Sequence, residues 1–394
     1  MQQIYFDYNA SSPVAQEVVD AMAPYARDAF GNPSSVHWAG RPAREAIDRS
    51  RQEVAALVGA DRDEIFFTGG GTESDNWAIK GFFYANRSRE GQVRATSDSS
   101  PENSGVHMIT SAIEHPAVSL PLEFLTRHHG VEVTTLPVDP AGRVRSEDVA
   151  RALRPETTLV SIMHANNEVG TIQPIAEIGK LCRTAGVCFH TDAAQSVGKV
   201  PIDVRELQVD LLTIAGHKLR APKGVGALYI RKGVQLEPLL HGAGHERGQR
   251  SGTENTSFVV GLGEAAELAR HHLANGAAGQ IGALRDRFEA GLKALFGEQI
   301  VINAVDAPRL PNTASINFVG RTGQEVLATV PGLAASTGAA CHSGIVELSR
   351  VLRAMGVSEN VGMGAIRFSL GWETTEQEVD SVLEAFRAAR STQC

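Results

Sequence analysis

The sequence predicts an α/β protein built on a large, mostly parallel sheet. Between residues 64 and 230, short apolar runs rich in β-branched residues alternate with longer stretches of helical periodicity, as a parallel sheet with crossover helices requires. Two helical stretches, 116–129 and 174–185, are each followed by a glycine suited to a helix C-terminus. The predicted strands are 64–68, 106–111, 131–138, 157–164, 187–193, 210–215 and 225–230.

The pattern changes after residue 254. Two helical stretches, 254 to about 275 and 280–296, follow each other with no predicted strand between them. Three predicted strands (313–319, 334–340, 366–370) then alternate with three predicted helices (324–330, 349–355, 376–389). This alternation predicts a smaller second α/β domain. We therefore expect a large domain of residues 15–260 and a small domain formed by 1–14 and 261–394.

Charge and composition limit the classes of partner. The 394 residues carry a formal net charge of -8, which gives no general attraction for nucleic acid or for anionic membrane surfaces. Small molecules and proteins remain as expected partners. No apolar run approaches membrane-spanning length, and the N-terminus has no basic region or hydrophobic stretch of a secretory signal, so a cytoplasmic location is the expectation.

The four cysteines are Cys182, Cys188, Cys341 and Cys394, with no CxxC pair among them. They are too sparse for a disulfide framework in a chain of this length, which favours free thiols in a reducing compartment. Cys182 lies in a predicted helix and Cys188 at the start of a predicted strand, so both are expected to be packing residues. Cys394, at the end of the chain, is expected to be disordered.

A glycine-rich turn, Gly69-Gly70-Gly71-Thr72-Glu73, joins the first predicted strand to a helix. The backbone N–H groups of such a turn, the positive end of the helix dipole and the Thr72 hydroxyl suit a phosphate. Many turns of this kind only tighten a strand-to-helix connection. The motif alone therefore leaves both interpretations open.

Two further motifs follow strands at the edge where open α/β sheets bind ligands. Asp192 ends the strand at 187–193, where its carboxylate could keep a pyridine nitrogen protonated or could cap the next helix. Lys218 follows the strand at 210–215, beside His217 and amid apolar flanks. This setting favours a lowered pKa and a Schiff base. A phosphate anchor, a ring-nitrogen partner and an amine that traps an aldehyde are together what a pyridoxal-phosphate enzyme needs.

The sequence resembles the cysteine desulfurases and selenocysteine lyases, which have the class V aminotransferase form of the type I pyridoxal-phosphate-dependent transferase fold. The resemblance runs nearly end to end and implies a large, mostly parallel seven-stranded sheet domain with a smaller C-terminal α/β domain. It is carried, in order, by YFDYNASSP, GNPSSVH, GGGTESDN, EHPAV, ANNEVGTIQP, HTDAAQSVGK, GHKLRAPKGVGALY, HERGQRSGTENT, ASTGAACHSG and RFSLG.

This resemblance implies a role for each matching residue. Lys218 would hold the cofactor aldehyde, with Asp192 on the pyridine nitrogen, Gln195 on the ring hydroxyl and His115 stacked on the ring as a further acid or base. The phosphate ligands would be Gly71, Thr72 and His217, with Thr253 reaching across from a second subunit of a homodimer. The substrate carboxylate would be bound by Asn167 and Arg367, although Arg367 by itself could be an ordinary surface charge on an edge strand.

Cys341 lies in a run of small residues able to form a mobile loop, and the resemblance makes it the nucleophile. As a thiolate it would take the substrate sulfur as a persulfide and release alanine. A buried, inert cysteine is the alternative. The sulfur would pass to an acceptor such as an iron–sulfur scaffold or a sulfur-relay protein, and no metal would be required in the enzyme.

Departures from the family pattern leave the substrate open. Ala215 stands where many members have a serine that contacts the phosphate, and Arg220 adds a charge close to the site. His342 after the cysteine, together with the polar segment 95–105, looks more like the selenocysteine lyases. The alternatives to a cysteine desulfurase are therefore a selenocysteine lyase, an aminotransferase or another lyase on the same fold, and a non-catalytic scaffold for sulfur-carrier proteins.

Overall fold

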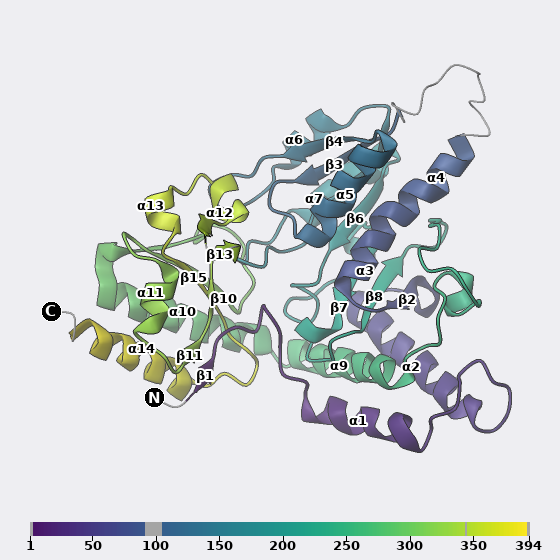
Figure 1. Ribbon diagram of the computed structural model, residues 1–394, viewed down its shortest axis with the longest axis horizontal. Coiled ribbons are helices and arrows are strands. Elements are labelled where there is room, and N and C mark those ends of the chain that lie inside the picture. Colours follow the sequence, from purple (N-terminus) through teal and green to yellow (C-terminus); the bar gives the residue numbers. More distant parts are fainter. Residues whose placement is uncertain (1–2, 91–104, 343–344, 392–394) are drawn as a thin grey trace.

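The computed structural model describes residues 3–90, 105–342 and 345–391 (Figure 1). Within these ranges, the side chains of residues 87–90 and 339–346 are outside the description. The polar segment expected at 95–105 therefore lies almost wholly outside the described residues, as does Cys394.

All seven strands predicted between residues 64 and 230 are confirmed, and they form one sheet in the order β2-β8-β7-β6-β5-β3-β4. The strands are β2 (Ile65–Thr68), β3 (His107–Ser111), β4 (Glu132–Leu136), β5 (Thr157–Ser161), β6 (Cys188–Asp192), β7 (Leu211–Ala215) and β8 (Gly226–Ile230). Neighbouring strands from β4 to β7 are parallel, whereas β8 is antiparallel to both β7 and β2. The sheet is thus mostly parallel, as predicted.

Helices cover both faces of this sheet, which explains the continuous apolar character of its strands. Neighbouring residues of one strand enter different cores, as with Met108 and Ile109 of β3. One face packs against α1 (Gln16–Arg27), α2 (Gly40–Val58), α7 (Ile175–Ala185) and α9 (Thr256–Ala274). The other packs against α4 (Phe82–Glu90), α5 (Pro116–His129) and the π-helical turn Trp77–Gly81. The predicted C-terminal glycines of α5 and α7, Gly130 and Gly186, have the expected left-handed conformation.

Shorter helices complete this part of the chain. They are α3 (Gly71–Asn76), α6 (Ser146–Ala152), α8 (Val204–Leu207) and the 3-10 turns Arg62–Glu64, Gly216–Lys218 and Glu246–Gly248. The turn Gly216–Lys218 comes directly after β7, so it sets where the Lys218 side chain starts.

A smaller antiparallel sheet has the order β12-β15-β10-β9. Its strands are β9 (Ile300–Ile302), β10 (Thr313–Phe318), β12 (Ser336–Thr337) and β15 (Ala365–Ser369). The prediction of a single strand at 334–340 is wrong, because this segment pairs with three different strands in turn. It forms β11 (Leu333–Ala334), β12 and β13 (Ala339–His342), which pair with β1 (Ile4–Tyr5), β15 and β14 (Ile345–Leu348), respectively.

An aromatic cluster forms the core of the smaller sheet. It contains Phe6, Phe288, Phe318, Phe368 and Phe386, all nearly fully buried. The long helices α10 (Ala277–Phe296) and α14 (Glu376–Ser391) pack on it, while α11 (Gly323–Ala328), α12 (Arg350–Ala354), α13 (Glu359–Gly362) and the 3-10 turn Gly297–Gln299 connect the strands.

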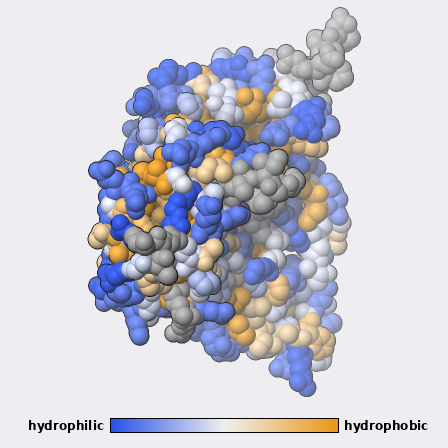
Figure 2. All heavy atoms as spheres, turned by 60° about the vertical axis from the view of Figure 1, so that its left-hand side comes forward, coloured by the Kyte–Doolittle hydropathy of each residue, from blue (hydrophilic) through white to orange (hydrophobic). Residues whose placement is uncertain are grey.

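Both ends of the chain lie beside this smaller sheet (Figure 1). The face of the molecule on the side of the smaller sheet is mostly hydrophilic, with small separate hydrophobic patches (Figure 2). No helix among the described residues has the length and apolar composition needed to cross a lipid bilayer.

Candidate active site

A pocket of about 390 Å³ opens where the strands of the large sheet end. His115 follows β3, Asp192 is the last residue of β6, and Lys218 follows β7. The carboxyl ends of parallel strands meet at one edge of a sheet. The reversed strand β8 places the end of β2 at the same edge, so the glycine-rich turn reaches this pocket too.

Most of the residues singled out in the sequence come together in this pocket. Its lining includes Gly71, Thr72, His115, Asn167, Asp192, Gln195, His217, Lys218 and Arg367. Arg367 comes from the smaller sheet, whereas the others come from the large sheet or the loops that follow its strands. The pocket therefore lies where the two sheets face each other.

The Lys218 side chain is half-buried at the pocket, and the pKa of its amine lies below the ordinary value for lysine. Burial lowers its pKa to about 8, against the opposing attraction of Asp192, while the charge of Arg367 lowers it further. Within the described residues, its Nζ atom has no hydrogen-bond partner. An amine with this pKa has a large neutral fraction near physiological pH, and the neutral form is the one that attacks aldehydes.

Asp192 lines the pocket and is 6% exposed. Its Oδ1 accepts a hydrogen bond of 2.8 Å from the backbone N–H of Ala194. Burial raises its pKa, while the Ala194 N–H, His115 and Lys218 act in the opposite direction. The alternative that Asp192 caps the next helix is wrong, because α8 begins only at Val204 and is capped by Asp203.

The two histidines of the pocket are held neutral. Burial lowers the pKa of His115, and it lowers the pKa of His217 to about 4 with help from the positive charge of Lys218. The Nδ1 atom of His115 accepts the backbone N–H of Ala117 at 3.1 Å. In the neutral ring the proton is therefore assigned to Nε2, which leaves an N–H available for donation.

The glycine-rich turn takes a conformation that only glycine adopts easily. Gly70 has a φ of 141°, and a Cβ on Gly71 would lie 3.2 Å from the methyl group of Ala215. The first residues of α3 can thus approach a ligand with their backbone. Ala215 itself lines the pocket with a methyl group where the family pattern has a serine hydroxyl.

Arg367 is not an edge-strand surface charge, because β15 pairs with β10 on one side and β12 on the other. Its Nη2 donates to Asp7 Oδ1 at 2.7 Å and to Ser336 Oγ at 2.9 Å, and its Nη1 donates to the Asn167 carbonyl at 2.9 Å. Its Nε is buried and has no hydrogen-bond partner among the described residues. Three of the five N–H groups are thus used, which holds the guanidinium firmly, and the Nε–H and one Nη1–H are left over.

Several lining residues were missed in the sequence, among them Asn9, Asp75 and Met163. Asp75 lies one helical turn after Gly71. This spacing in the sequence could have indicated that both residues face the same side of the helix. Asp75 is 2% exposed, and its Oδ1 lies 3.5 Å from His190 Nε2 and accepts no hydrogen bond from the residues that the structure describes. Burial together with the nearby Asp192 raises its pKa well above the usual range. Asn9 was inside a quoted motif, but nothing in the motif indicates its contacts.

Two of the singled-out residues are not placed in this pocket. Thr253 lines a separate one with Gly69 and Arg250, on the other side of the glycine-rich turn. The backbone of Cys341 lies in β13, opposite Val346 of β14, and its side chain lies outside the described residues.

Two further cysteines, Cys182 and Cys188, behave as predicted. Both are free thiols. Burial raises the pKa of Cys182 to about 12 and that of Cys188 well above its ordinary value. Thiols with such pKa values stay protonated and unreactive, so both are packing residues.

Comparisons with known proteins agree with this arrangement. The family model described as "Aminotransferase class-V" matches residues 4–382. A cysteine desulfurase IscS from Methanosarcina thermophila is 45% identical over 383 residues, covering 97% of this chain and 90% of that protein. One from Dictyoglomus turgidum is 43% identical over 385 residues, covering 97% and 93%.

Two solved structures are also similar to this chain. A NifS-like protein has a TM-score of 0.87 at 36% identity, covering 99% of this chain and 100% of its own. A structure described as SspA in complex with cysteine has a TM-score of 0.80 at 37% identity, covering 93% and 98%. The chain belongs to the class V aminotransferase family. Within that family, its similar relatives are cysteine desulfurases.

Members of this family depend on pyridoxal phosphate, and the residues of the pocket fit that group. Lys218 offers an amine with a lowered pKa, Asp192 offers a buried carboxylate, and Gly71 and Thr72, at the start of α3, offer backbone N–H groups that precede the hydrogen bonds of the helix itself. Arg367 lines the same pocket with a guanidinium suited to a substrate carboxylate. The donor set therefore matches an aldehyde, a pyridine nitrogen and a phosphate.

Proposed function

We propose that this protein is a pyridoxal-phosphate-dependent cysteine desulfurase that converts L-cysteine to L-alanine and transfers the sulfur to Cys341. The observation that carries the proposal is the pairing of Lys218, with its pKa near 8, and the buried Asp192 in one pocket. The names of the relatives, and the cysteine complex of the similar SspA structure, support cysteine as the substrate.

When bound, pyridoxal phosphate supplies an electron sink for the charge left on the substrate Cα. Asp192 would keep the ring nitrogen protonated, which strengthens that sink. Gln195 would donate to the ring hydroxyl and His115 would cover the ring. Gly71, Thr72 and His217 would bind the phosphate, together with Thr253 from a second subunit of a homodimer.

Lys218 would act as the base that removes the Cα proton. Its pKa near 8 is close to the working pH, where a general base is most effective. The neutral His115 ring offers its Nε2–H as a hydrogen-bond donor in the same pocket. The substrate carboxylate would be bound by Arg367 and Asn167, which fixes the Cα–H bond relative to Lys218.

The sulfur transfer balances as an exchange of bonds. The Cβ–S bond of cysteine breaks, an S–S bond forms between that sulfur and the Cys341 thiolate, and the carbon skeleton takes up a proton and leaves as alanine. The persulfide would then pass to a sulfur-acceptor protein, such as an iron–sulfur scaffold or a sulfur relay.

The test uses the purified protein with L-cysteine and a thiol. We expect equal amounts of alanine and sulfide, a visible absorption band near 400 nm that disappears in Lys218→Ala, and no sulfide from Cys341→Ser. A colourless wild-type protein that forms neither product would refute the proposal and would revive the scaffold hypothesis. Full activity of Cys341→Ser would favour another reaction on this fold. A selenocysteine lyase is not proposed, because the similar relatives are named cysteine desulfurases.

A further inference from the structure

A second lysine, Lys199, is buried beside the candidate active site and has no role in the proposed chemistry. It is 8% exposed and lies in the turn region that follows β6. Its Nζ donates to Asn9 Oδ1 at 2.7 Å and to Gln195 Oε1 at 3.0 Å. Burying a lysine costs free energy. A buried lysine that bonds to two side-chain amides is therefore expected to have a role.

The contact with Lys199 fixes which end of the Gln195 amide faces which neighbour. A lysine amine that donates to Gln195 requires the amide oxygen on its side. The Gln195 Nε2 then points the other way, where one of its two N–H groups donates to the Asn9 carbonyl at 3.0 Å. Since Gln195 lines the pocket, the remaining N–H is the group that it can offer to a ligand there.

Asn9 is fixed by the same network, so it cannot turn to compensate. Its Oδ1 accepts from Lys199 and from Asn312 Nδ2 at 3.0 Å. Its Nδ2 donates to Thr313 Oγ1 at 2.8 Å and to the Asn167 carbonyl at 3.3 Å. All four hydrogen-bonding positions of this amide are used, which holds the Asn9 carbonyl in place against Gln195.

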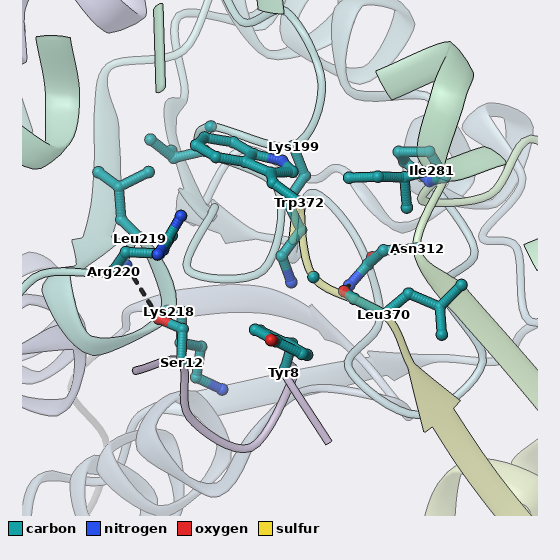
Figure 3. A pocket seen from close by; sticks show the side chains of 14 residues that line it. Tyr8, Ser12, Lys199, Lys218, Leu219, Arg220, Ile281, Asn312, Leu370 and Trp372 are labelled. Atoms are coloured by element: carbon teal, nitrogen blue, oxygen red, sulfur yellow. Dashed lines mark hydrogen bonds between the residues drawn. The ribbon is translucent and has the colours of Figure 1, made fainter. Parts of the chain in front are cut away.

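Lys199 does not line the main pocket but a smaller one of about 30 Å³ on its far side. In Figure 3 the Lys199 and Asn312 side chains point toward one another across this smaller pocket. Its volume has room for about one or two water molecules, too little for a substrate. Any effect of Lys199 on a ligand of the main pocket is therefore transmitted through its neighbours.

We propose that Lys199 is a positioning residue that locks the Gln195 amide with an N–H group facing the cofactor. This inference rests on the proposed function, because it concerns the group that Gln195 would bind. Lys199 holds the Gln195 amide from the side away from the ligand, so the orientation of the amide is fixed before the cofactor binds.

The test measures pyridoxal phosphate binding to the cofactor-free protein by fluorescence titration. Lys199→Met removes the donors at nearly the same length, and Gln195→Met removes the amide that Lys199 is said to orient. We expect Lys199→Met alone to weaken binding about tenfold, the size of one lost hydrogen bond. In a protein that already carries Gln195→Met, the same substitution should change binding less than about twofold. The amide that Lys199 orients is then missing, and the effects of coupled residues on binding do not add.

Two further variants sharpen the comparison. Lys199→Gln keeps an N–H donor and should recover part of the lost affinity. Should the methionine variant not fold, the smaller loss caused by Lys199→Gln is measured in both backgrounds and should likewise shrink in Gln195→Met. Lys180→Met changes an exposed lysine of α7 and should have no effect.

Equal losses from Lys199→Met in both backgrounds, or no loss in either, would overturn the inference. A wild-type protein that binds no pyridoxal phosphate would instead overturn the proposed function. The two failures are thus distinguishable.

Discussion

Replacing Lys218 by methionine should stabilise the cofactor-free protein. Burial of the charged amine lowers its pKa from the ordinary value of 10.5 to about 8. At 1.36 kcal/mol for each pKa unit, the charged form costs the folded state about 3 kcal/mol. Methionine has a similar length and no charge, so the substitution removes this cost.

The gain should depend on pH in a defined direction. Below pH 8 the amine is charged in both the folded and the unfolded chain, so the full cost is present. Between pH 8 and 10.5 the folded chain has lost the proton and the unfolded chain still holds it, so wild-type stability rises with pH. The advantage of Lys218→Met should therefore be largest at pH 7 and should vanish toward pH 10.5.

Urea unfolding of the two cofactor-free proteins at pH 7 to 10 measures this difference, with the fluorescence of the buried Trp77 as one reporter. We expect a difference of about 3 kcal/mol at pH 7, or about 4 °C in melting temperature for a chain of this length. The matched control is Lys180→Met, at an exposed position, which should change stability by less than about 0.5 kcal/mol at every pH. A Lys218→Met protein no more stable than wild type at pH 7, or a difference that is constant with pH, would refute the reasoning.

Three further substitutions test other parts of the molecule. Asp192→Asn should lower the rate of alanine formation about 100-fold or more while the absorption band of the bound cofactor remains, and an unchanged rate would contradict the role of the carboxylate. Arg367→Lys replaces the planar guanidinium and its five fixed N–H groups by a single ammonium, so the KM for cysteine should rise about tenfold or more; a change in kcat alone would argue against substrate binding. Phe386→Ala opens the aromatic core of the smaller sheet and should cost about 3 to 5 kcal/mol in urea unfolding, and a loss below about 1 kcal/mol would mean that this core is not tightly packed.

The large sheet could be predicted from the sequence because its strands are covered on both faces. Such strands are continuous apolar runs, and the turns between them carry glycines with a specific backbone conformation, as at Gly130 and Gly186. Since the strands are parallel, the residues that follow them had to meet at one edge. This is why His115, Asp192 and Lys218 could be placed together in advance.

The smaller sheet was harder to predict because its strands are short and change partners. The segment 334–340 has one composition but three partners in turn, and β9 and β14 were not predicted at all. The bonds between Asn9 and Lys199 were also missed. They join residues far apart in sequence, and a polar residue in a motif does not indicate which distant amine it accepts from.

Several expectations stay predictions. Among them are the domain boundaries near residues 14 and 260, the contribution of Thr253 to a second subunit, and the nucleophilic role of Cys341.

The position of the N-terminal segment has a consequence for how the protein is made. Ile4 and Tyr5 pair with Leu333 and Ala334, and Asn9 bonds to residues at 312, 313 and 369. On the ribosome residues 4–9 therefore emerge well before these partners, which are synthesised only after the whole large sheet. The large sheet can fold as soon as its own strands have emerged. The pocket, by contrast, is complete only after Arg367 has emerged, so the cofactor can be bound in its final site only after that point.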